Sequence, residues 1–238
     1  SDKFDPANNE DDTAKWFYAK SGKLAQSTIK TIAGKKYGFN AKGEMVVGLN
    51  KVDFEYDEET KAVYATFTLI EEAGQVAAMD VAEIGYGAGV VGADHTADMG
   101  YYYFSADEDN DGSLKTGAQK VSVDGDDYDF YFSTKAGSKG LGITGLQGNK
   151  YYYNGKKIAA DDSVADYLFF ETAKDEAGNL YVKPAAAHKF AEFVGETVGS
   201  DYVLIAKNGT VAKSGTKKDG NGYKATYSKT LGWSVTVE

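Results

Sequence analysis

Consecutive tyrosines are the side chains of this sequence that are best suited to bind a ligand. Residues 101–104 read YYYF, and residues 151–153 read YYY. Neighbouring residues of a strand point to opposite faces of the sheet, so the rings of one run cannot all face a single core. Burying one such ring contributes about 1.5–3 kcal/mol, which explains part of each run without any ligand. The remaining rings must cover a second layer or stand exposed, and an exposed aromatic patch is typical of a binding surface.

An acidic stretch could supply a second kind of chemistry, the binding of calcium. Asp107, Asp109 and Asp111 alternate before Gly112, and carboxylates at alternate positions with a glycine at the bend can wrap one ion. Ala118 stands where such a loop places its bidentate glutamate. We therefore interpret the stretch as a solvated hairpin turn and predict no metal site, with calcium on the three aspartates as the weaker alternative.

The residue types that catalysis needs do not form a recognisable constellation. His95 and His188 are the only histidines, and neither has the spacing of a metal site or of a nucleophile triad. Cysteine is absent, which excludes disulfides, thiolate metal sites and cysteine nucleophiles. Acidic pairs such as residues 126–127 and 161–162 are common in the turns of an acidic chain. We predict a protein that is not an enzyme and uses no cofactor.

Charge and hydropathy limit the possible partners. A formal net charge of -10 argues against nucleic acid and against attraction to anionic lipid. No apolar run approaches the length of a membrane span, so we expect no membrane insertion, and the first residues do not resemble a signal peptide. The chain is therefore either cytosolic, or secreted with its export signal removed before this numbering begins. For a secreted protein, the lack of cysteine favours a Gram-positive surface.

Short hairpins closed by glycine are the elements that must position these side chains. In residues 32–49, Tyr37 and Phe39 share one face of a strand, and Gly43 supplies a turn that needs a positive φ. Gly22 lies 21 residues before Gly43, and Trp16 lies 21 residues before Tyr37, so the unit repeats. One hairpin alone is marginal in water, so copies must stack. We predict an all-β protein of stacked β-hairpin repeats, elongated and β-solenoid-like.

The chain divides into four segments by pattern. Residues 1–12 are acidic without periodicity and are predicted to be a disordered leader. Hairpin repeats are expected over residues 13–50 and 101–238, and a divergent β segment over residues 51–100. Residues 184–194 break the hairpin style, because a proline precedes three alanines and Phe190 and Phe193 stand three apart; they predict one short helix.

The repeated units resemble the cell-wall-binding repeats of Gram-positive surface proteins. These units are WFYAKSGKLAQS, GKKYGFNAKGEMVVG, YYYFSADEDNDGSLKTG and GNKYYYNGKKI. The superfamily includes choline-binding modules, glucan-binding repeats of streptococcal glucosyltransferases and the repetitive regions of large clostridial toxins. The resemblance covers residues 14–50 and 100–160, is looser over 166–238, and is absent from 71–99.

The resemblance implies a non-catalytic protein of the cell surface, secreted, that binds cell-wall polysaccharide or a host glycan through Tyr-lined grooves between repeats. Choline-binding members use cages built largely of tryptophan. This chain has two tryptophans and 18 tyrosines, which is more similar to the glycan-binding members, where sugar faces stack on exposed rings. The candidate stacking residues are Trp16, Tyr18, Tyr37, Tyr102, Tyr131, Tyr152 and Trp233.

Two alternatives to glycan binding remain at this stage. The protein could be a structural or adhesive spacer whose rings only hold the repeats together, or an enzyme with its site in the divergent 51–100 region. Whether the middle rings of the aromatic runs are exposed distinguishes the glycan-binding hypothesis from the spacer hypothesis. If their neighbours face the core, then Tyr102, Tyr131 and Tyr152 point outward, one per hairpin.

Overall fold

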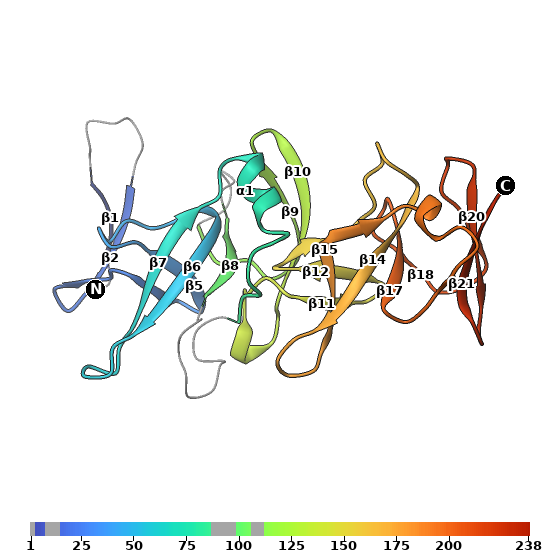
Figure 1. Ribbon diagram of the computed structural model, residues 1–238. Coiled ribbons are helices and arrows are strands. Elements are labelled where there is room, and N and C mark those ends of the chain that lie inside the picture. Colours follow the sequence, from blue (N-terminus) through green and yellow to red (C-terminus); the bar gives the residue numbers. More distant parts are fainter. Residues whose placement is uncertain (1–2, 8–14, 87–98, 106–111) are drawn as a thin grey trace. The chain divides into compact units, whose positions relative to one another are not determined.

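Figure 1 shows the computed structural model of the chain, which describes residues 3–7, 15–86, 99–105 and 112–238. Short antiparallel strands dominate it. Within the described residues there is one α-helix, α1 (Ala73–Ala78), and there are two 3-10 helices, η1 (Ala136–Ser138) and η2 (Phe190–Phe193). No helix in these ranges is long and apolar enough to cross a membrane. The prediction of an all-β chain of hairpins is confirmed, and its elongation stays a prediction.

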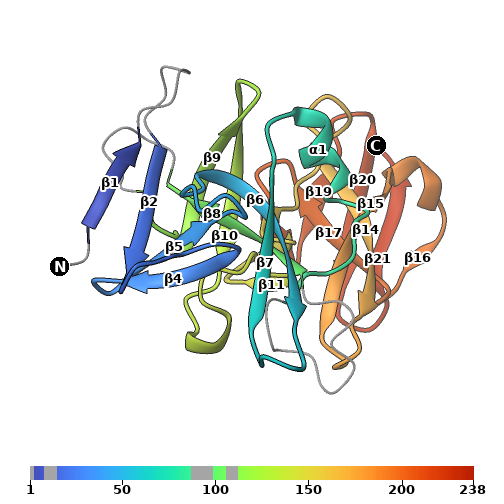
Figure 2. The same ribbon diagram turned by 90° about the vertical axis from the view of Figure 1, so that its left-hand side faces the viewer.

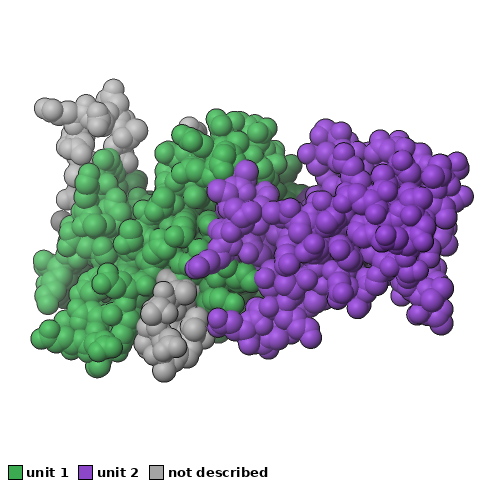
Figure 3. Space-filling model, viewed as in Figure 1, with its two compact units in different colours: residues 1–76, 84–142 green, residues 77–83, 143–238 purple. Residues whose placement is uncertain are grey.

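The chain forms two compact units, coloured separately in Figure 3. The first comprises residues 1–76 and 84–142, and the second comprises residues 77–83 and 143–238. The segment boundaries expected near residues 50 and 100 fall inside the first unit. The reason is that β6 (Gly48–Tyr56) is the central strand of a sheet, pairing with β7 (Val63–Leu69) on one edge and β8 (Met99–Phe104) on the other.

The first unit is built from small sheets whose apolar faces pack together. One sheet has the order β1-β2-β3, a second is the hairpin β4-β5, a third has the order β7-β6-β8, and β9 and β10 form a further hairpin. Figure 2 shows β4 beside β7, and next to β4 the Ala65 amide donates to the Ser27 carbonyl oxygen at 2.7 Å. The remaining strands are β1 (Lys3–Ala7), β2 (Lys15–Lys20), β3 (Lys23–Leu24), β4 (Thr28–Ile32), β5 (Lys35–Phe39), β9 (Gly117–Val123) and β10 (Asp126–Phe132).

The predicted disordered leader is wrong for Lys3–Ala7. These residues form β1, which pairs antiparallel with β2 in a register that sets Lys3 opposite Ala19 and Ala7 opposite Lys15. The physical reason is that β2 has two edges, and β3 covers only the end of one of them. The other edge presents a row of backbone donors and acceptors, which any extended segment can satisfy regardless of its side chains. Residues 1–2 and 8–12 of the expected leader lie outside the described ranges.

Among the described residues of the first unit, two apolar clusters contribute to its core. One comprises the buried residues Tyr18, Ala25, Tyr37 and Phe39. The other comprises Val52, Ala65, Tyr102, Phe104 and Leu141. The backbone approaches closely at Gly38, where an added Cβ would lie 2.5 Å from a Val46 methyl group and 3.0 Å from the Phe104 ring. Only glycine fits between these side chains, so Gly38 sets how closely β5 approaches the second cluster.

A half-buried carboxylate ties the first two hairpins of this unit. Glu44 accepts hydrogen bonds from Asn40 Nδ2 at 2.9 Å and from Lys15 Nζ at 3.0 Å. These two donors favour the charged form, so they lower the pKa of the Glu44 carboxyl below its usual range, with Asn40 as the larger cause. The ion pair between Lys15 and Glu44 joins β2 to the turn that follows β5.

The second unit consists of three sheets that follow one another along the chain. Their orders are β11-β12-β13, then β15-β14-β17-β18, then β16-β21-β20-β19. A cluster around Phe169, Phe190, Leu204 and Trp233 forms its core. The strands are β11 (Gly145–Gln147), β12 (Lys150–Tyr153), β13 (Lys156–Lys157), β14 (Tyr167–Lys174), β15 (Leu180–His188), β16 (Thr197–Val198), β17 (Tyr202–Ala206), β18 (Val211–Ala212), β19 (Thr216–Lys218), β20 (Tyr223–Ser228) and β21 (Gly232–Val237).

The predicted helix over residues 184–194 is confirmed only for the single 3-10 turn η2. Residues 184–188 instead belong to β15, which pairs with β14. The register shifts between Phe170 and Thr172, so Pro184 lies in the bulged part of β15. A bulge tolerates proline, because no ladder hydrogen bond is made there that needs the missing N–H. Pro184 therefore fits within β15 and does not start a helix.

Residues 77–83 belong to the second unit because three side chains of its first hairpin hold them. Tyr153 Oη donates to the Ala82 carbonyl oxygen at 2.8 Å, and Asn154 Nδ2 donates to the Glu83 carbonyl oxygen at 2.9 Å. Lys156 Nζ lies 2.8 Å from the Asp80 carboxylate. These residues lie in the part of the sequence where no repeat was recognisable, and they are tied to a hairpin more than 70 residues further along the chain.

Candidate functional site

Most of the aromatic residues that the sequence nominates are core residues. Trp16 is exposed, with 42% of its surface accessible, and Tyr131 is half-buried. The others are buried, each with 8% or less of its surface accessible. They are Tyr18, Tyr37, Tyr102, Tyr152 and Trp233.

The prediction that Tyr102 and Tyr152 point outward is wrong. All six residues of β8 are buried, because both faces of this strand are covered. Tyr102 and Phe104 belong to the second apolar cluster, while the Tyr103 ring stacks on Phe132 at a centroid distance of 6.2 Å. Residues 151–153 are buried in the same way. The alternation of a strand decides which rings share a face, but what packs on each face decides exposure.

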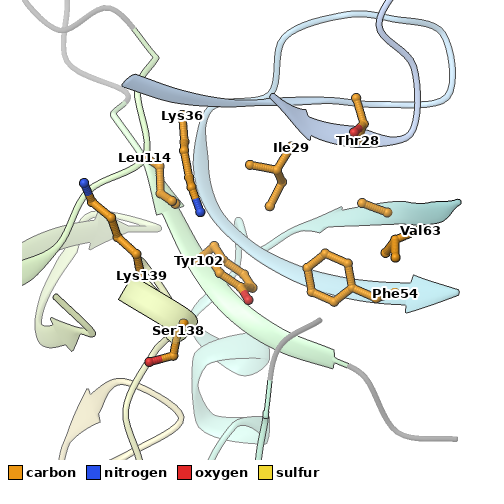
Figure 4. A pocket seen from close by; sticks show the side chains of 11 residues that line it. Thr28, Ile29, Lys36, Phe54, Val63, Tyr102, Leu114, Ser138 and Lys139 are labelled. Carbon is orange, nitrogen blue, oxygen red and sulfur yellow. The ribbon is translucent and has the colours of Figure 1, made fainter. Parts of the chain in front are cut away.

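A pocket in the first unit brings one of these tyrosines to a solvent-accessible surface (Figure 4). The pocket has a volume of about 260 Å³ and is open to solvent. Two of its walls are the rings of Tyr102 and Phe54, whose centroids are 5.9 Å apart and whose planes are nearly perpendicular at 84°. Ile29 and Leu114 add aliphatic surface. The pocket is therefore a corner of two rings with an apolar lining.

Six separate segments of the chain assemble this corner, and one of them, β7, contributes Val63 and Ala65. Phe54 lies on β6 two residues after Val52, on the same face, and Tyr102 lies on the neighbouring strand β8. The β4-β5 hairpin contributes Ile29, and the Leu114 amide donates to the Lys36 carbonyl oxygen at 2.8 Å, which holds these two residues together. The turn η1 closes the remaining side.

Lys36 supplies the charge inside the pocket. Lys36 and Lys139 both line it, and in Figure 4 the Lys36 ammonium group points into the space between Ile29 and Tyr102, whereas the Lys139 ammonium group points away from the rings. Ser138 lines the rim, and its Oγ lies 2.8 Å from Ser133 Oγ. No aspartate, glutamate or histidine is among the described residues that line this pocket.

The second unit has a smaller open pocket of similar chemistry. Its volume is about 210 Å³. It is lined by the Tyr167 ring, by Asn208 and Ser214, and by the lysines Lys213 and Lys217. Its described lining also includes no acidic residue. Each unit thus carries one pocket that combines a tyrosine with two lysines.

Sequence analysis missed most of these pocket residues. Phe54 was recognisable as one member of an alternating strand, but nothing in its neighbourhood marked it as exposed. Lys36 precedes an aromatic residue in the repeat, which marks a strand and not a site. The pocket depends on contacts between segments that are far apart in sequence, so no local pattern encodes it.

Among the described residues, the remaining charged groups form no cluster that could hold a metal ion. His188 lies between two carboxylates, with Nδ1 2.9 Å from Glu192 Oε2 and Nε2 3.4 Å from Glu171 Oε1. Its hydrogen bond lowers the pKa of Glu192. Within the described ranges no three His, Asp or Glu side chains are placed to hold a metal ion. The candidate calcium ligands Asp107, Asp109 and Asp111 lie outside those ranges.

Comparison with known proteins finds similar solved structures only. No family model and no curated protein sequence matches the chain. Choline binding protein F from Streptococcus pneumoniae is 15% identical with a TM-score of 0.38, and the match covers 98% of this chain and 86% of that one. CbpF in complex with ipratropium is 17% identical (TM-score 0.33, 90% and 48% covered), and the modular autolysin LytC from Streptococcus pneumoniae is 12% identical (TM-score 0.22, 93% and 46% covered).

The chain spans about half the length of the CbpF–ipratropium and LytC chains. Because these TM-scores are below 0.5, the description of the fold rests on this chain's own strands and their pairing.

Proposed function

We propose that this chain is a non-catalytic protein of the cell surface that binds cell-wall polysaccharide or another glycan. The observation that carries the proposal is the perpendicular pair of Tyr102 and Phe54 rings at an open pocket. The apolar C–H face of a sugar ring packs on an aromatic ring, and its hydroxyl groups need polar partners at the rim. The Lys36 ammonium and the Thr28 hydroxyl stand at that rim.

The size of the pocket supports one sugar unit at a time. Pockets for drug-sized ligands hold about 300–1,000 Å³, and a volume of about 260 Å³ lies just below this range. Because the pocket is open, neighbouring units of a polysaccharide can continue into solvent. Weak contacts of this kind add up when a polymer meets several equivalent sites.

The proposal is for binding and not for hydrolysis. Glycoside hydrolysis uses a pair of carboxyl groups, one as acid and one as base or nucleophile. The described lining of neither pocket includes a carboxylate. What the linings do supply is rings, ammonium groups, hydroxyl groups and amides, which are groups that hold a sugar.

A sedimentation assay with isolated Gram-positive walls, together with a glycan array, tests this function. Phe54→Leu keeps apolar volume and removes the ring, so we expect wall or glycan binding to weaken by about three- to tenfold. Tyr64→Leu is the matched control, because Tyr64 is an exposed ring on the neighbouring strand β7 and does not line the pocket. A parent protein that binds neither walls nor any glycan would contradict the function. Binding that is equal in the parent and Phe54→Leu would contradict the site.

Burial of the nominated aromatics favours a second candidate, a structural spacer. Tyr18, Tyr37 and Tyr152 are fully used in packing, as a spacer requires. Under this hypothesis the protein binds no glycan, while replacing any of the three by Ala costs about 3–5 kcal/mol of folding stability. The wall-binding assay separates the two candidates, because only the glycan-binding hypothesis predicts a signal for the parent protein.

A further inference from the structure

The two pockets differ in charge from the rest of the chain. The sequence has 36 acidic residues and 26 lysines, with a net charge of -10. Of the described residues that line the pockets, four are lysines and none is acidic. On an acidic protein, a lysine-lined pocket is a local positive site, and such sites attract anions and repel cations.

Lys36 is placed to meet a ligand rather than a neighbouring carboxylate. It is half-buried on β5, and its ammonium points into the pocket. Elsewhere in the first unit, lysines in comparable positions pair with acids: Lys15 with Glu44 at 3.0 Å and Lys51 with Asp53 at 2.7 Å. No ion pair of Lys36 or Lys139 is found within the part of the chain that the structure describes. An ammonium that is partly withdrawn from water gains most from a charged partner.

We infer that the pocket of the first unit takes an anionic sugar, meaning a sugar unit that carries a carboxylate or a phosphate. This inference rests on the proposed function and names the class of glycan. The sugar face packs on Tyr102 and Phe54 while the anionic group pairs with Lys36. Aromatic corners also attract quaternary ammonium groups, but the Lys36 charge beside the rings repels them.

The pocket of the second unit fits the same chemistry. Tyr167 offers one ring, and Lys213 and Lys217 offer two ammonium groups. Asn208 and Ser214 can bond hydroxyl groups. We therefore expect two sites per chain, one in each unit, with the same preference for anionic sugars.

Two oligosaccharides that differ only in charge provide the test. An oligogalacturonate carries one carboxylate per sugar, and its fully methyl-esterified form has the same rings without the charge. Isothermal titration calorimetry should show that the parent protein binds the acid at least about tenfold more tightly than the ester, as expected for one charge-assisted contact. The preference should fall as salt rises from about 0.05 to about 0.5 M. An oligomer of phosphodiester-linked hexoses, in a separate arm, tells phosphate from carboxylate as the source of the anion.

Matched lysine variants locate the effect. Lys36→Gln should lose most of the preference for the acid over the ester, because it weakens binding of the acid far more than binding of the ester. Lys30→Gln is the control, because Lys30 is exposed on the same hairpin, does not line the pocket and changes the net charge equally. It should keep the preference.

Three results would overturn the inference: equal binding of acid and ester by the parent, binding of neither the oligogalacturonate nor the phosphate oligomer, or equal effects of Lys36→Gln and Lys30→Gln. Binding of the ester or another neutral glycan in these cases leaves the proposed function standing. Failure of the parent protein to bind any glycan, charged or neutral, contradicts the proposed function as well.

Discussion

Replacing Asn154 by alanine should destabilise the second unit, because this residue contributes both a backbone conformation and a hydrogen bond. Asn154 has a φ of 51° and Gly155 a φ of 89°, as in the type I′ turn that joins two paired strands. The Asn154 side chain is fully buried, and its Nδ2 donates to the Glu83 carbonyl oxygen at 2.9 Å. The turn therefore anchors residues 77–83 to the unit.

The expected loss combines these two contributions. A left-handed φ costs an ordinary L-residue such as alanine roughly 1–2 kcal/mol, and the lost hydrogen bond costs about 1 kcal/mol. Asn154→Ala should therefore lower the free energy of unfolding by about 2–3 kcal/mol. Asn154→Gly adopts the same φ without strain but loses the hydrogen bond to Glu83, so its cost should be about 1 kcal/mol.

Urea denaturation followed by tryptophan fluorescence measures both variants. In a Trp16→Phe background the remaining tryptophan, Trp233, lies in the core of the second unit and reports on its unfolding. Asn208→Ala is the matched control in the other Asn-Gly turn. Asn208 is exposed, and there only Gly209, with a φ of 82°, is left-handed. Its replacement should cost about 0.5 kcal/mol or less.

Two results would refute the reasoning about this turn. Equal destabilisation by Asn154→Ala and Asn154→Gly would mean that the left-handed backbone imposes no cost on alanine. A change within about 0.5 kcal/mol for both variants would mean that the hydrogen bond to Glu83 does not anchor residues 77–83.

Other perturbations test the packing and electrostatics of the first unit. Gly38→Ala places a Cβ 2.5 Å from a Val46 methyl group and should cost about 1–3 kcal/mol in a thermal melt, whereas Gly74→Ala meets no neighbouring atom and should not destabilise. Since the Asn40 hydrogen bond lowers the pKa of Glu44, its contribution is present above the unfolded pKa and is lost as pH falls through the folded pKa. Glu44→Gln should therefore cost about 1 kcal/mol at about pH 7 and almost nothing at about pH 3, and an equal cost at both would contradict this.

Local patterns predicted the strands and turns because their causes are local. Residues 52–56 read VDFEY, an alternation that predicts Val52 and Phe54 on one face, and β6 confirms it. Gly43 was predicted to supply a turn, Gly22 is its counterpart in the repeat, and both have a positive φ. A glycine tolerates this conformation whatever surrounds it, so the sequence alone was enough.

The dipeptide Asn-Gly forms two different turns in this chain, because the surroundings of its two copies differ. Asn-Gly occurs at residues 154–155 and at residues 208–209, and this dipeptide favours a tight hairpin turn. Asn154 is left-handed and buried because residues 77–83 pack against it, whereas Asn208 is exposed. The distinction depends on a segment about 70 residues away, which no dipeptide signal contains.

The sequence by itself determined an all-β chain of glycine-closed hairpins, its acidic charge and its excess of tyrosine over tryptophan. Only the tertiary structure decided which rings are core and which form a site. Tyr102 was expected to face solvent on its own, yet it is reached only through a pocket that Phe54 and Lys36 share from other strands. The alternation of a strand determines only which face of the sheet each side chain points to. Exposure and charge depend instead on which distant segments pack around that side chain, and the energy that selects them comes from burying the core as a whole.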